Sequence, residues 1–330
     1  MPLLRPTFAW LEITGLCNEK CRHCYAGSSP QGDHGTMTDD DWRRVIRELK
    51  GLGVRNVQFI GGEPTLHPAL PGLIRYALAN GMLIEVFSNL THLTEAVWNA
   101  LRLPGVRLAF SYYSDDPADH DDVTMARGSH ARTRANVVKA RKLGIPLRGS
   151  VIGVLEGQRG EQARGDLLRL GIRDVRQDRI RPFGRGADGK DPRMDKLCGR
   201  CGRGKFAIGP DGEVWPCVFA RWMALGNVHE QSLEEIYAGV PMRAARAELQ
   251  ALFPGAGVSM APTCLPDCTP SFESCSPQTA CAPDAACGPT NSDGGDSGGG
   301  EQAWTKPREA IGAPERSVRY YNPGVSDTDC

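Results

Sequence analysis

Between residue 8 and about residue 181, segments patterned as strands alternate with segments patterned as helices. The helices repeat apolar residues three and four positions apart, as Trp42, Val45 and Leu49 do. The predicted strands are the run ending at Gly15 and residues 54–60, 83–87, 106–110, 146–154 and 173–180. The predicted helices start after Thr38 and after Thr94 and cover 69–79, 134–143 and 162–170. This alternation predicts a parallel sheet with helices outside it, an open partial (β/α)6 TIM-like barrel.

Three cysteines follow the first predicted strand. Cys17, Cys21 and Cys24 are spaced C-x3-C-x2-C on a short polar loop, so all three thiols can face one metal centre. A four-iron cluster needs four ligands, and three from the protein leave one iron open to an outside molecule. The alternatives are a zinc knuckle or merely buried cysteines, although zinc normally takes a fourth Cys or His at short range.

Candidate ligand-binding residues follow the later strands, at the edge of a parallel barrel where ligands bind. After the second strand lies Gly61-Gly62-Glu63-Pro64. Its glycines allow close backbone approach to a ligand, and its carboxylate can accept a hydrogen bond from an ammonium group. The other candidates are Ser88, Asn89, Ser111, Arg127 and Val151. Ordinary turn chemistry is the alternative for the polar residues, and a buried strand is the alternative for Val151.

The cysteine loop resembles that of the radical S-adenosylmethionine (SAM) superfamily, C-x3-C-x-aromatic-C, with His23 at the aromatic position. The resemblance implies that the open iron of a [4Fe-4S] cluster binds SAM, and that one electron splits the sulfonium to give a 5′-deoxyadenosyl radical. It also implies cofactor contacts for His23, Gly61, Gly62, Glu63, Pro64, Ser88, Asn89, Ser111, Arg127 and Val151. In that family the GGEP segment engages the methionine amino group, and the fifth strand lies beside the adenine.

A second group of cysteines begins beyond the predicted barrel. Cys198, Cys201 and Cys217 flank a predicted hairpin with strands at 206–208 and 213–215, which would return Cys217 toward the other two. The layout resembles the start of a SPASM or twitch extension, C-x9–15-G-x4-C, with ten residues between Cys201 and Gly212. The resemblance implies ligands of an auxiliary [4Fe-4S] cluster. A structural zinc ribbon is the alternative.

Five further cysteines lie in a stretch rich in Pro, Ser and Ala: Cys264, Cys268, Cys275, Cys281 and Cys287. Their spacings of three, six, five and five residues match the SPASM pattern in number and order, not in detail. Three ligands for the SAM cluster and eight for two auxiliary clusters make eleven, and eleven cysteines precede Cys330. We therefore expect one or two auxiliary clusters, with the individual ligands left open.

The expected domains are a radical SAM barrel at 1–185, a SPASM-like cluster domain at 186–290 and a flexible tail rich in Gly, Ser and Asp at 291–330. Basic and acidic residues balance at 39 each, so the chain lacks the basic field typical of nucleic-acid binding. No signal peptide is visible, and no apolar stretch approaches the roughly 18 residues of a membrane span. We expect a cytoplasmic protein that binds neither nucleic acid nor membrane, whose cysteines bind metal.

Radical SAM proteins with SPASM extensions commonly modify ribosomally made peptides. The resemblance therefore implies crosslinking, epimerisation or a related oxidation of a precursor peptide, with auxiliary clusters as electron acceptors and a flavodoxin or ferredoxin as electron donor. Only sixteen residues precede Cys17, so we expect leader recognition by a separate leader-binding protein or by the barrel surface. Two other classes stay open. One is a SPASM or twitch dehydrogenase or epimerase acting on a sugar or cofactor precursor, and the other is a non-catalytic iron–sulfur or zinc protein.

Overall fold

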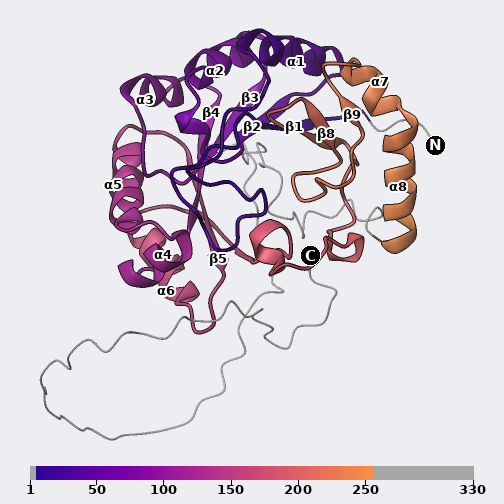
Figure 1. Cartoon of the computed structure of the whole chain (residues 1–330). Coiled ribbons are helices and arrows are strands. Elements are labelled where there is room, and N and C mark those ends of the chain that lie inside the picture. The colour runs from indigo at the N-terminus through magenta and orange to yellow at the C-terminus, as the bar shows by residue number, and fades with distance from the viewer. Residues whose placement is uncertain (1–4, 256–330) are drawn as a thin grey trace, which may run out of the picture. The chain divides into compact units, whose positions relative to one another are not determined.

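The computed structural model describes residues 5–255, which belong to one unit of the chain. Their strands form one nine-stranded sheet in the order β6-β5-β4-β3-β2-β1-β7-β8-β9 (Figure 1). The strands are β1 (Phe8–Glu12), β2 (Asn56–Ile60), β3 (Leu83–Ser88), β4 (Val106–Tyr112), β5 (Leu147–Gly153), β6 (Asp174–Arg179), β7 (Lys205–Ile208), β8 (Glu213–Trp215) and β9 (Gly226–Asn227). Strands β1 to β7 pair in parallel, and β6 and β9 are the sheet's edges, which confirms the open partial barrel.

The helices lie along the outer side of the curved sheet (Figure 1). They are α1 (Asp39–Gly51), α2 (Leu70–Ala79), α3 (Glu95–Leu101), α4 (Pro117–Thr124), α5 (Ser129–Lys142), α6 (Gly160–Arg169), α7 (Leu233–Ala238) and α8 (Val240–Leu252), with short 3-10 turns η1 (Pro64–Leu66), η2 (Gly184–Ala187) and η3 (Met194–Lys196). Thr38 and Thr94 cap α1 and α3 with their side chains, as the sequence predicts.

Helix α4 is missing from the sequence-based prediction, and α5 begins earlier than predicted. The α4 segment has little apolar periodicity, so its pattern gives no helical signal. A local signal does exist, because Asp116 accepts hydrogen bonds from the first turn and Pro117 occupies an early helical position. The start of α5 depends on Asp121, whose carboxylate accepts from the backbone N–H of Gly128 and of His130.

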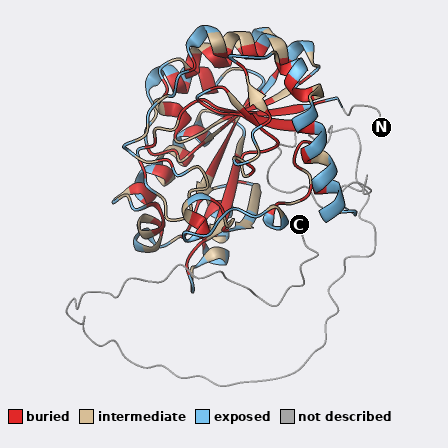
Figure 2. Ribbon diagram, turned by 45° about the vertical axis from the view of Figure 1, so that its right-hand side comes forward, coloured by how far each residue is buried: buried red, intermediate tan, exposed pale blue. Residues whose placement is uncertain are grey.

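The two faces of the sheet have different roles. Alternate residues of β1, such as Ala9 and Leu11, pack in the large core beneath the helices. Trp10 points to the other face and packs in a second cluster that contains Cys201 and Cys217. Figure 2 shows the strands buried and the outward sides of the helices exposed. The inner face is therefore the one that holds candidate functional residues.

The inner face also carries an ionic network. The Glu85 carboxylate on β3 accepts from Arg148 of β5 at 2.7 Å and pairs with Arg107 of β4 at 3.1 Å. Arg107 also pairs with Asp174 of β6 at 2.8 Å, and the amide nitrogen of Gln58 on β2 lies 2.5 Å from Glu85. Arg148 and Glu85 are fully buried. Charged side chains thus connect four neighbouring strands across the barrel interior, and the Gln58 amide adds β2 as a fifth.

The predicted hairpin is confirmed, and it joins the barrel sheet. Strands β7 and β8 pair in antiparallel fashion around Gly212, whose φ of +80° suits a residue without a Cβ. Strand β7 also pairs in parallel with β1, with Lys205 opposite Phe8. The five later cysteines, Cys264, Cys268, Cys275, Cys281 and Cys287, and the tail predicted for 291–330 lie outside the described residues.

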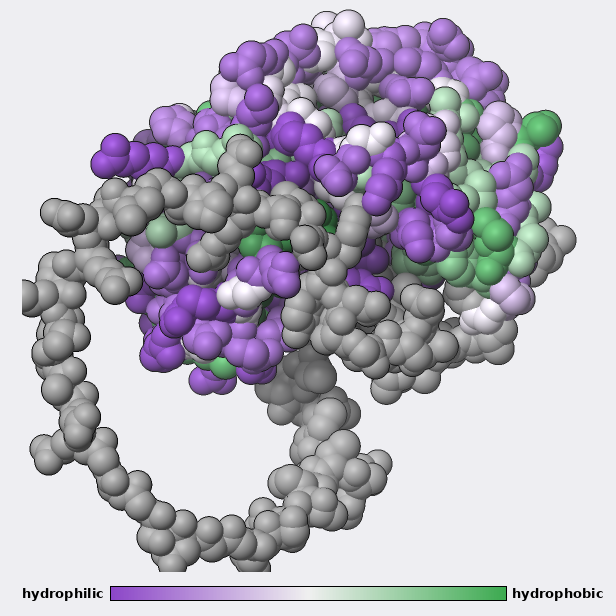
Figure 3. All heavy atoms as spheres, turned by 60° about the horizontal axis from the view of Figure 1, so that its bottom comes forward, coloured by the Kyte–Doolittle hydropathy of each residue, from purple (hydrophilic) through white to green (hydrophobic). Residues whose placement is uncertain are grey.

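One face of the described part of the surface is mainly polar. The face drawn in Figure 3 is largely hydrophilic where it is not grey. No helix within residues 5–255 is both long enough and apolar enough to span a bilayer.

Candidate functional site

Cys17, Cys21 and Cys24 lie on the loop that follows β1, at the end of the sheet where the parallel strands finish. Cys17 is buried and accepts a hydrogen bond from the backbone N–H of Glu19, with 3.4 Å between nitrogen and sulfur. Burial raises the pKa of the Cys21 thiol well above its usual value, and Glu19, Cys24 and Cys17 raise it further. The three thiols are therefore close enough to interact electrostatically.

These thiols fit an iron–sulfur cluster. Thiolates are the usual ligands of such clusters, and a cationic metal centre offsets the cost of burying them together. Within residues 5–255, no three Cys, His, Asp or Glu side chains converge as they would around a single ion. A four-iron cluster does not need that convergence, because each of its thiolates binds a different iron. The assignment of Cys17, Cys21 and Cys24 as its ligands stays a prediction.

The Gly61–Pro64 segment packs directly on the cysteine loop. The N–H of Gly62 donates to the carbonyl of Thr14 at 2.7 Å, and the N–H of Glu63 donates to that of Leu16 at 2.8 Å. A Cβ on Gly62 would lie 2.1 Å from the Leu16 carbonyl oxygen, so no side chain fits there. The glycines thus let the backbone of the Gly61–Pro64 segment lie against the cysteine loop, in addition to any contact with a ligand.

The Glu63 carboxylate joins the chain at the end of β2 to the chain at the end of β3 by hydrogen bonds. It is buried and accepts from the N–H and hydroxyl of Thr65, the hydroxyl of Ser88 and the N–H of Asn89, at 2.7–3.0 Å. Asn89 in turn donates to Asn18 of the cysteine loop at 2.8 Å. Leu90 has a φ of +58°, so it adopts the left-handed conformation for which glycine is better suited. Glu63, Ser88 and Asn89 therefore form one hydrogen-bonded unit beside the cysteines.

We expect Glu63→Gln to destabilise the fold. Whichever way the new amide turns, its NH2 group faces the backbone N–H of Thr65 or of Asn89, and that donor loses its partner. An unsatisfied buried donor costs about 1–3 kcal/mol, which urea unfolding followed by circular dichroism would measure. The matched control is Glu161→Gln, because Glu161 is exposed and accepts from Gln177. Equal unfolding free energies for the two variants would contradict the expectation.

His23 lies between the cysteines and β4. Its ring packs against Tyr113 with centroids 5.1 Å apart, and its Nε2 is 3.4 Å from the Tyr113 hydroxyl. Burial, and then the nearby Arg185 guanidinium, lower the pKa of His23 to about 4, so the ring is neutral at pH 7. A neutral ring is suited to contact with a planar ligand such as an adenine.

The remaining predicted SAM contacts have different environments. Ser111 lies on the inner face of β4, next to Ser150 of β5 in the sheet register. Arg127 is exposed on the turn between α4 and α5. Val151 packs in the core beneath the helices, as a buried strand would require. Their roles stay predictions.

Two contacts of the cysteine loop were not anticipated from the sequence. The N–H groups of Lys20 and Arg22 donate to carbonyls at the end of α4, and Arg22 pairs with Asp122 at 2.6 Å. Arg185 donates to the carbonyls of Cys21 at 2.8 Å and Ser28 at 2.7 Å. Both contacts hold the cysteine loop in place, and no local sequence signal marks either of them.

A polar cavity of about 380 Å³ adjoins the cysteine loop. Residues 26–33 of that loop, the end of β1 and the hairpin turn at Pro210 and Asp211 line it. The buried Glu12 forms an ion pair with the half-buried Arg221 in its wall, and the Tyr25 hydroxyl lies 3.4 Å from Glu12. Its size is within the range of small-ligand pockets, about 300–1,000 Å³.

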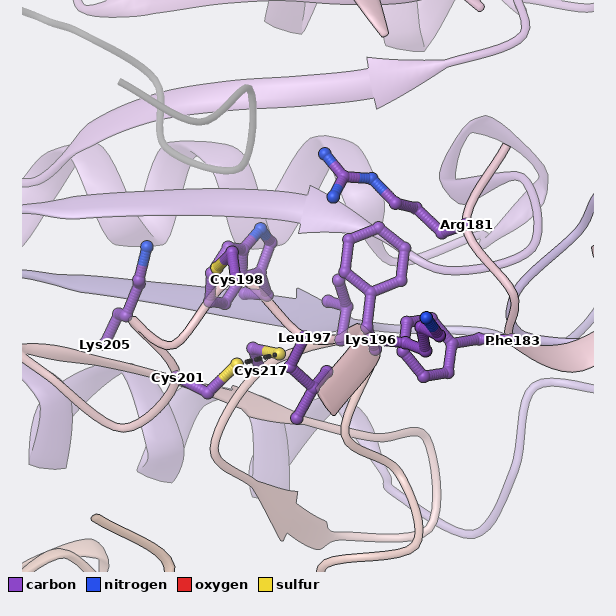
Figure 4. A pocket seen from close by; sticks show the side chains of 11 residues that line it. Arg181, Phe183, Lys196, Leu197, Cys198, Cys201, Lys205 and Cys217 are labelled. Atoms are coloured by element: carbon purple, nitrogen blue, oxygen red, sulfur yellow. Dashed lines mark hydrogen bonds between the residues drawn. The ribbon is translucent and has the colours of Figure 1, made fainter. Parts of the chain in front are cut away.

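Cys198, Cys201 and Cys217 come together on the inner face, as the hairpin geometry predicts (Figure 4). The sulfurs of Cys201 and Cys217 are 2.9 Å apart. Apolar side chains, including Trp10, Phe183 and Val218, enclose the thiols, and no carboxylate lines this pocket. Buried soft donors in an apolar wall fit an iron–sulfur cluster, and the assignment of these three cysteines as its ligands stays a prediction.

Comparison with known proteins identifies both parts of the chain. Residues 11–168 match the radical SAM superfamily, and residues 198–269 match the SPASM iron–sulfur cluster-binding domain. The chain carries a radical SAM domain followed by a SPASM domain. Domains of these two kinds bind [4Fe-4S] clusters, which agrees with the two groups of thiols on the inner face.

One curated relative of this radical SAM protein is named for the biosynthesis of a bacteriocin, and another is named as a peptide cyclase. It is 26% identical to the antilisterial bacteriocin subtilosin biosynthesis protein AlbA of Bacillus subtilis, over 70% of this chain and 59% of AlbA. It is 30% identical to the PqqA peptide cyclase of Bradyrhizobium diazoefficiens, over 53% of this chain and 45% of the cyclase. The chain thus spans less than two thirds of each relative.

The fold of the radical SAM protein is similar to that of Streptococcus suis SuiB, solved in complex with its precursor peptide SuiA. The TM-score is 0.61, and the match covers 73% of this chain and 67% of SuiB. Sequence identity is 14%, so the likeness concerns the fold alone.

Proposed function

We propose that this protein cleaves SAM reductively and uses the resulting radical to modify a ribosomally made peptide. The observation that carries the proposal is the packing of Gly61–Pro64 on the loop that holds Cys17, Cys21 and Cys24. It puts three thiols and a glycine-rich backbone at one end of a parallel sheet, where barrel enzymes bind their ligands.

In the proposed mechanism, Cys17, Cys21 and Cys24 would hold a [4Fe-4S] cluster that binds SAM. When bound, the cluster supplies the electron that splits the sulfonium into methionine and a 5′-deoxyadenosyl radical. The Gly61–Pro64 backbone orients the methionine part, and Glu63 keeps that backbone fixed through Ser88 and Asn89. The neutral His23 ring and Tyr113 shield the adenosine side from water.

We propose a precursor peptide as substrate, because one curated relative is named as a PqqA peptide cyclase and another is named for the biosynthesis of a bacteriocin. The 380 Å³ cavity beside the cysteine loop is large enough for a peptide side chain, and its lining is mainly polar. The radical takes one hydrogen atom from the peptide, and closing a crosslink releases one proton and one electron. A one-electron acceptor is then needed, and an auxiliary cluster held by Cys198, Cys201 and Cys217 belongs to that class.

The proposed partners follow from this chemistry. A flavodoxin or ferredoxin supplies the first electron, and a separate leader-binding protein presents the peptide. Both would be cytoplasmic, as we propose for this protein itself.

The test is anaerobic reconstitution with iron and sulfide, followed by SAM and a reductant. We expect 5′-deoxyadenosine and methionine in equal amounts, measured by liquid chromatography. Iron analysis should give about twelve atoms per chain with two auxiliary clusters and about eight with one. Absence of 5′-deoxyadenosine in iron-loaded protein would refute the radical function.

A second assay tests the substrate class. We expect a short peptide encoded beside the gene to lose the mass of two hydrogen atoms for each crosslink, measured by mass spectrometry. Deuterium transfer from a labelled peptide into 5′-deoxyadenosine would show that the peptide is the hydrogen donor. Turnover of a sugar or cofactor precursor, with no change in the peptide, would favour the small-molecule alternative.

A further inference from the structure

Lys205 is a buried cation on the inner face of the sheet. It begins β7, and only 6% of it is exposed. Side chains alternate along a strand, so Lys205 shares a face with Ala207, which packs in the cluster that contains Cys201 and Cys217. Lys205 lines the same pocket as Cys198, Cys201 and Cys217 (Figure 4).

The charge of Lys205 has no acidic partner in residues 5–255. Arg181 and Lys196, the other cations that line this pocket, pair with Asp178 at 3.0 Å and Asp195 at 3.9 Å. Lys205 instead has its ammonium nitrogen 5.6 Å from the centre of the Trp10 ring. The described lining of the pocket contains no carboxylate, so the field of Lys205 acts on the thiols with little compensation.

A buried cation beside the three thiols favours negative charge at this site. The apolar walls formed by Phe183, Leu197 and Phe219 keep water from screening that charge.

We propose that Lys205 raises the reduction potential of the auxiliary cluster held by Cys198, Cys201 and Cys217. The inference rests on the proposed assignment of these thiols as ligands. Each electron added to a cluster increases its negative charge, and a nearby buried cation stabilises the reduced form more than the oxidised form. The charge of Lys205 thus makes the auxiliary site a better electron acceptor.

The experiment measures the midpoint potential of the auxiliary cluster in full-length protein. The background variant carries Cys17→Ala, Cys21→Ala and Cys24→Ala, so that only auxiliary clusters contribute to the signal. Lys205→Met removes the charge and keeps most of the stem, whereas Lys205→Arg keeps the charge. Lys196→Met is the matched control, because Lys196 lines the same pocket but is 54% exposed and paired.

We expect Lys205→Met to reduce the ratio of reduced to oxidised cluster about tenfold at a fixed potential, in an electron paramagnetic resonance titration. That change equals about 59 mV for a one-electron couple, toward more negative potential. Lys205→Arg and Lys196→Met should stay close to the background variant. If Lys205→Met does not fold, Lys205→Gln is measured in its place, in protein with the same iron content as the background variant.

Two negative results of this experiment have different meanings. An auxiliary signal whose potential is the same with and without the Lys205 charge overturns the inference alone. Iron-loaded background protein without any auxiliary signal overturns the ligand assignment, and the inference with it. Neither result affects SAM cleavage at Cys17, Cys21 and Cys24, which is measured separately in protein with those cysteines intact.

Discussion

Cys21→Ala should abolish SAM cleavage. The loop holds its three thiols close together, and Cys21 contributes both a thiol and a carbonyl that accepts a hydrogen bond from the Arg185 guanidinium. The backbone carbonyl survives the substitution, so the loop stays anchored while the metal site loses a ligand. We expect 5′-deoxyadenosine formation to fall by at least about 10³-fold, because typical enzymatic accelerations exceed about 10⁶-fold.

Cys201→Ala is the matched comparison for Cys21→Ala. Both remove one thiol from a group of three on the inner face, but Cys201 belongs to the second group. We expect Cys201→Ala to keep SAM cleavage measurable and to stop peptide modification, since only the electron-accepting site is damaged. Liquid chromatography of 5′-deoxyadenosine and mass spectrometry of the peptide separate the two effects. SAM cleavage that survives Cys21→Ala at the wild-type rate would contradict the ligand assignment.

Glu85→Ala should destabilise the barrel by about 3–5 kcal/mol, the usual cost of breaking a buried ion pair. The loss leaves the Arg148 guanidinium without its carboxylate in a fully buried position, 2.7 Å from where the acceptor was. Arg107 keeps Asp174 as a partner, so the uncompensated charge is mainly that of Arg148. Urea unfolding followed by circular dichroism measures the change.

Two further variants test the cause of this loss. Asp115→Ala breaks an ion pair with Arg159, whose side chain is 48% exposed, and should cost less than about 1 kcal/mol. The double variant Glu85→Leu, Arg148→Met removes both charges and should recover part of the stability, because no buried charge is left unpaired. A double variant as unstable as Glu85→Ala would point to lost packing instead of lost charge compensation.

The sequence predicted the barrel because its signals are local. Most barrel strands and most helices have their own apolar pattern, and capping residues such as Thr38 and Thr94 lie next to the helices that they start. The prediction missed α4, because a short polar helix has no period to detect. It did predict the hairpin around Gly212, where turn and strand residues are neighbours in the chain.

The sequence also predicted which residues belong to the candidate site, but not how they are held. Cysteine spacing indicates a cluster loop because three thiols on one short loop can meet without any other part of the chain. Glu63 was expected to face a ligand, and the structure shows its carboxylate bonded to Thr65, Ser88 and Asn89. The partners of a buried carboxylate depend on which strand ends become neighbours, and spacing within one motif does not specify that.

By itself, the sequence determined the β/α alternation, the two groups of thiols and their order along the chain. Only the tertiary structure decided that α4 and Arg185 hold the cysteine loop, and that Lys205 lies among the second group of thiols. Strand β7 brings Lys205 there by pairing with β1, almost two hundred residues earlier in the chain. Local patterns reflect neighbours within a turn or a strand, whereas these contacts depend on how distant segments pack together.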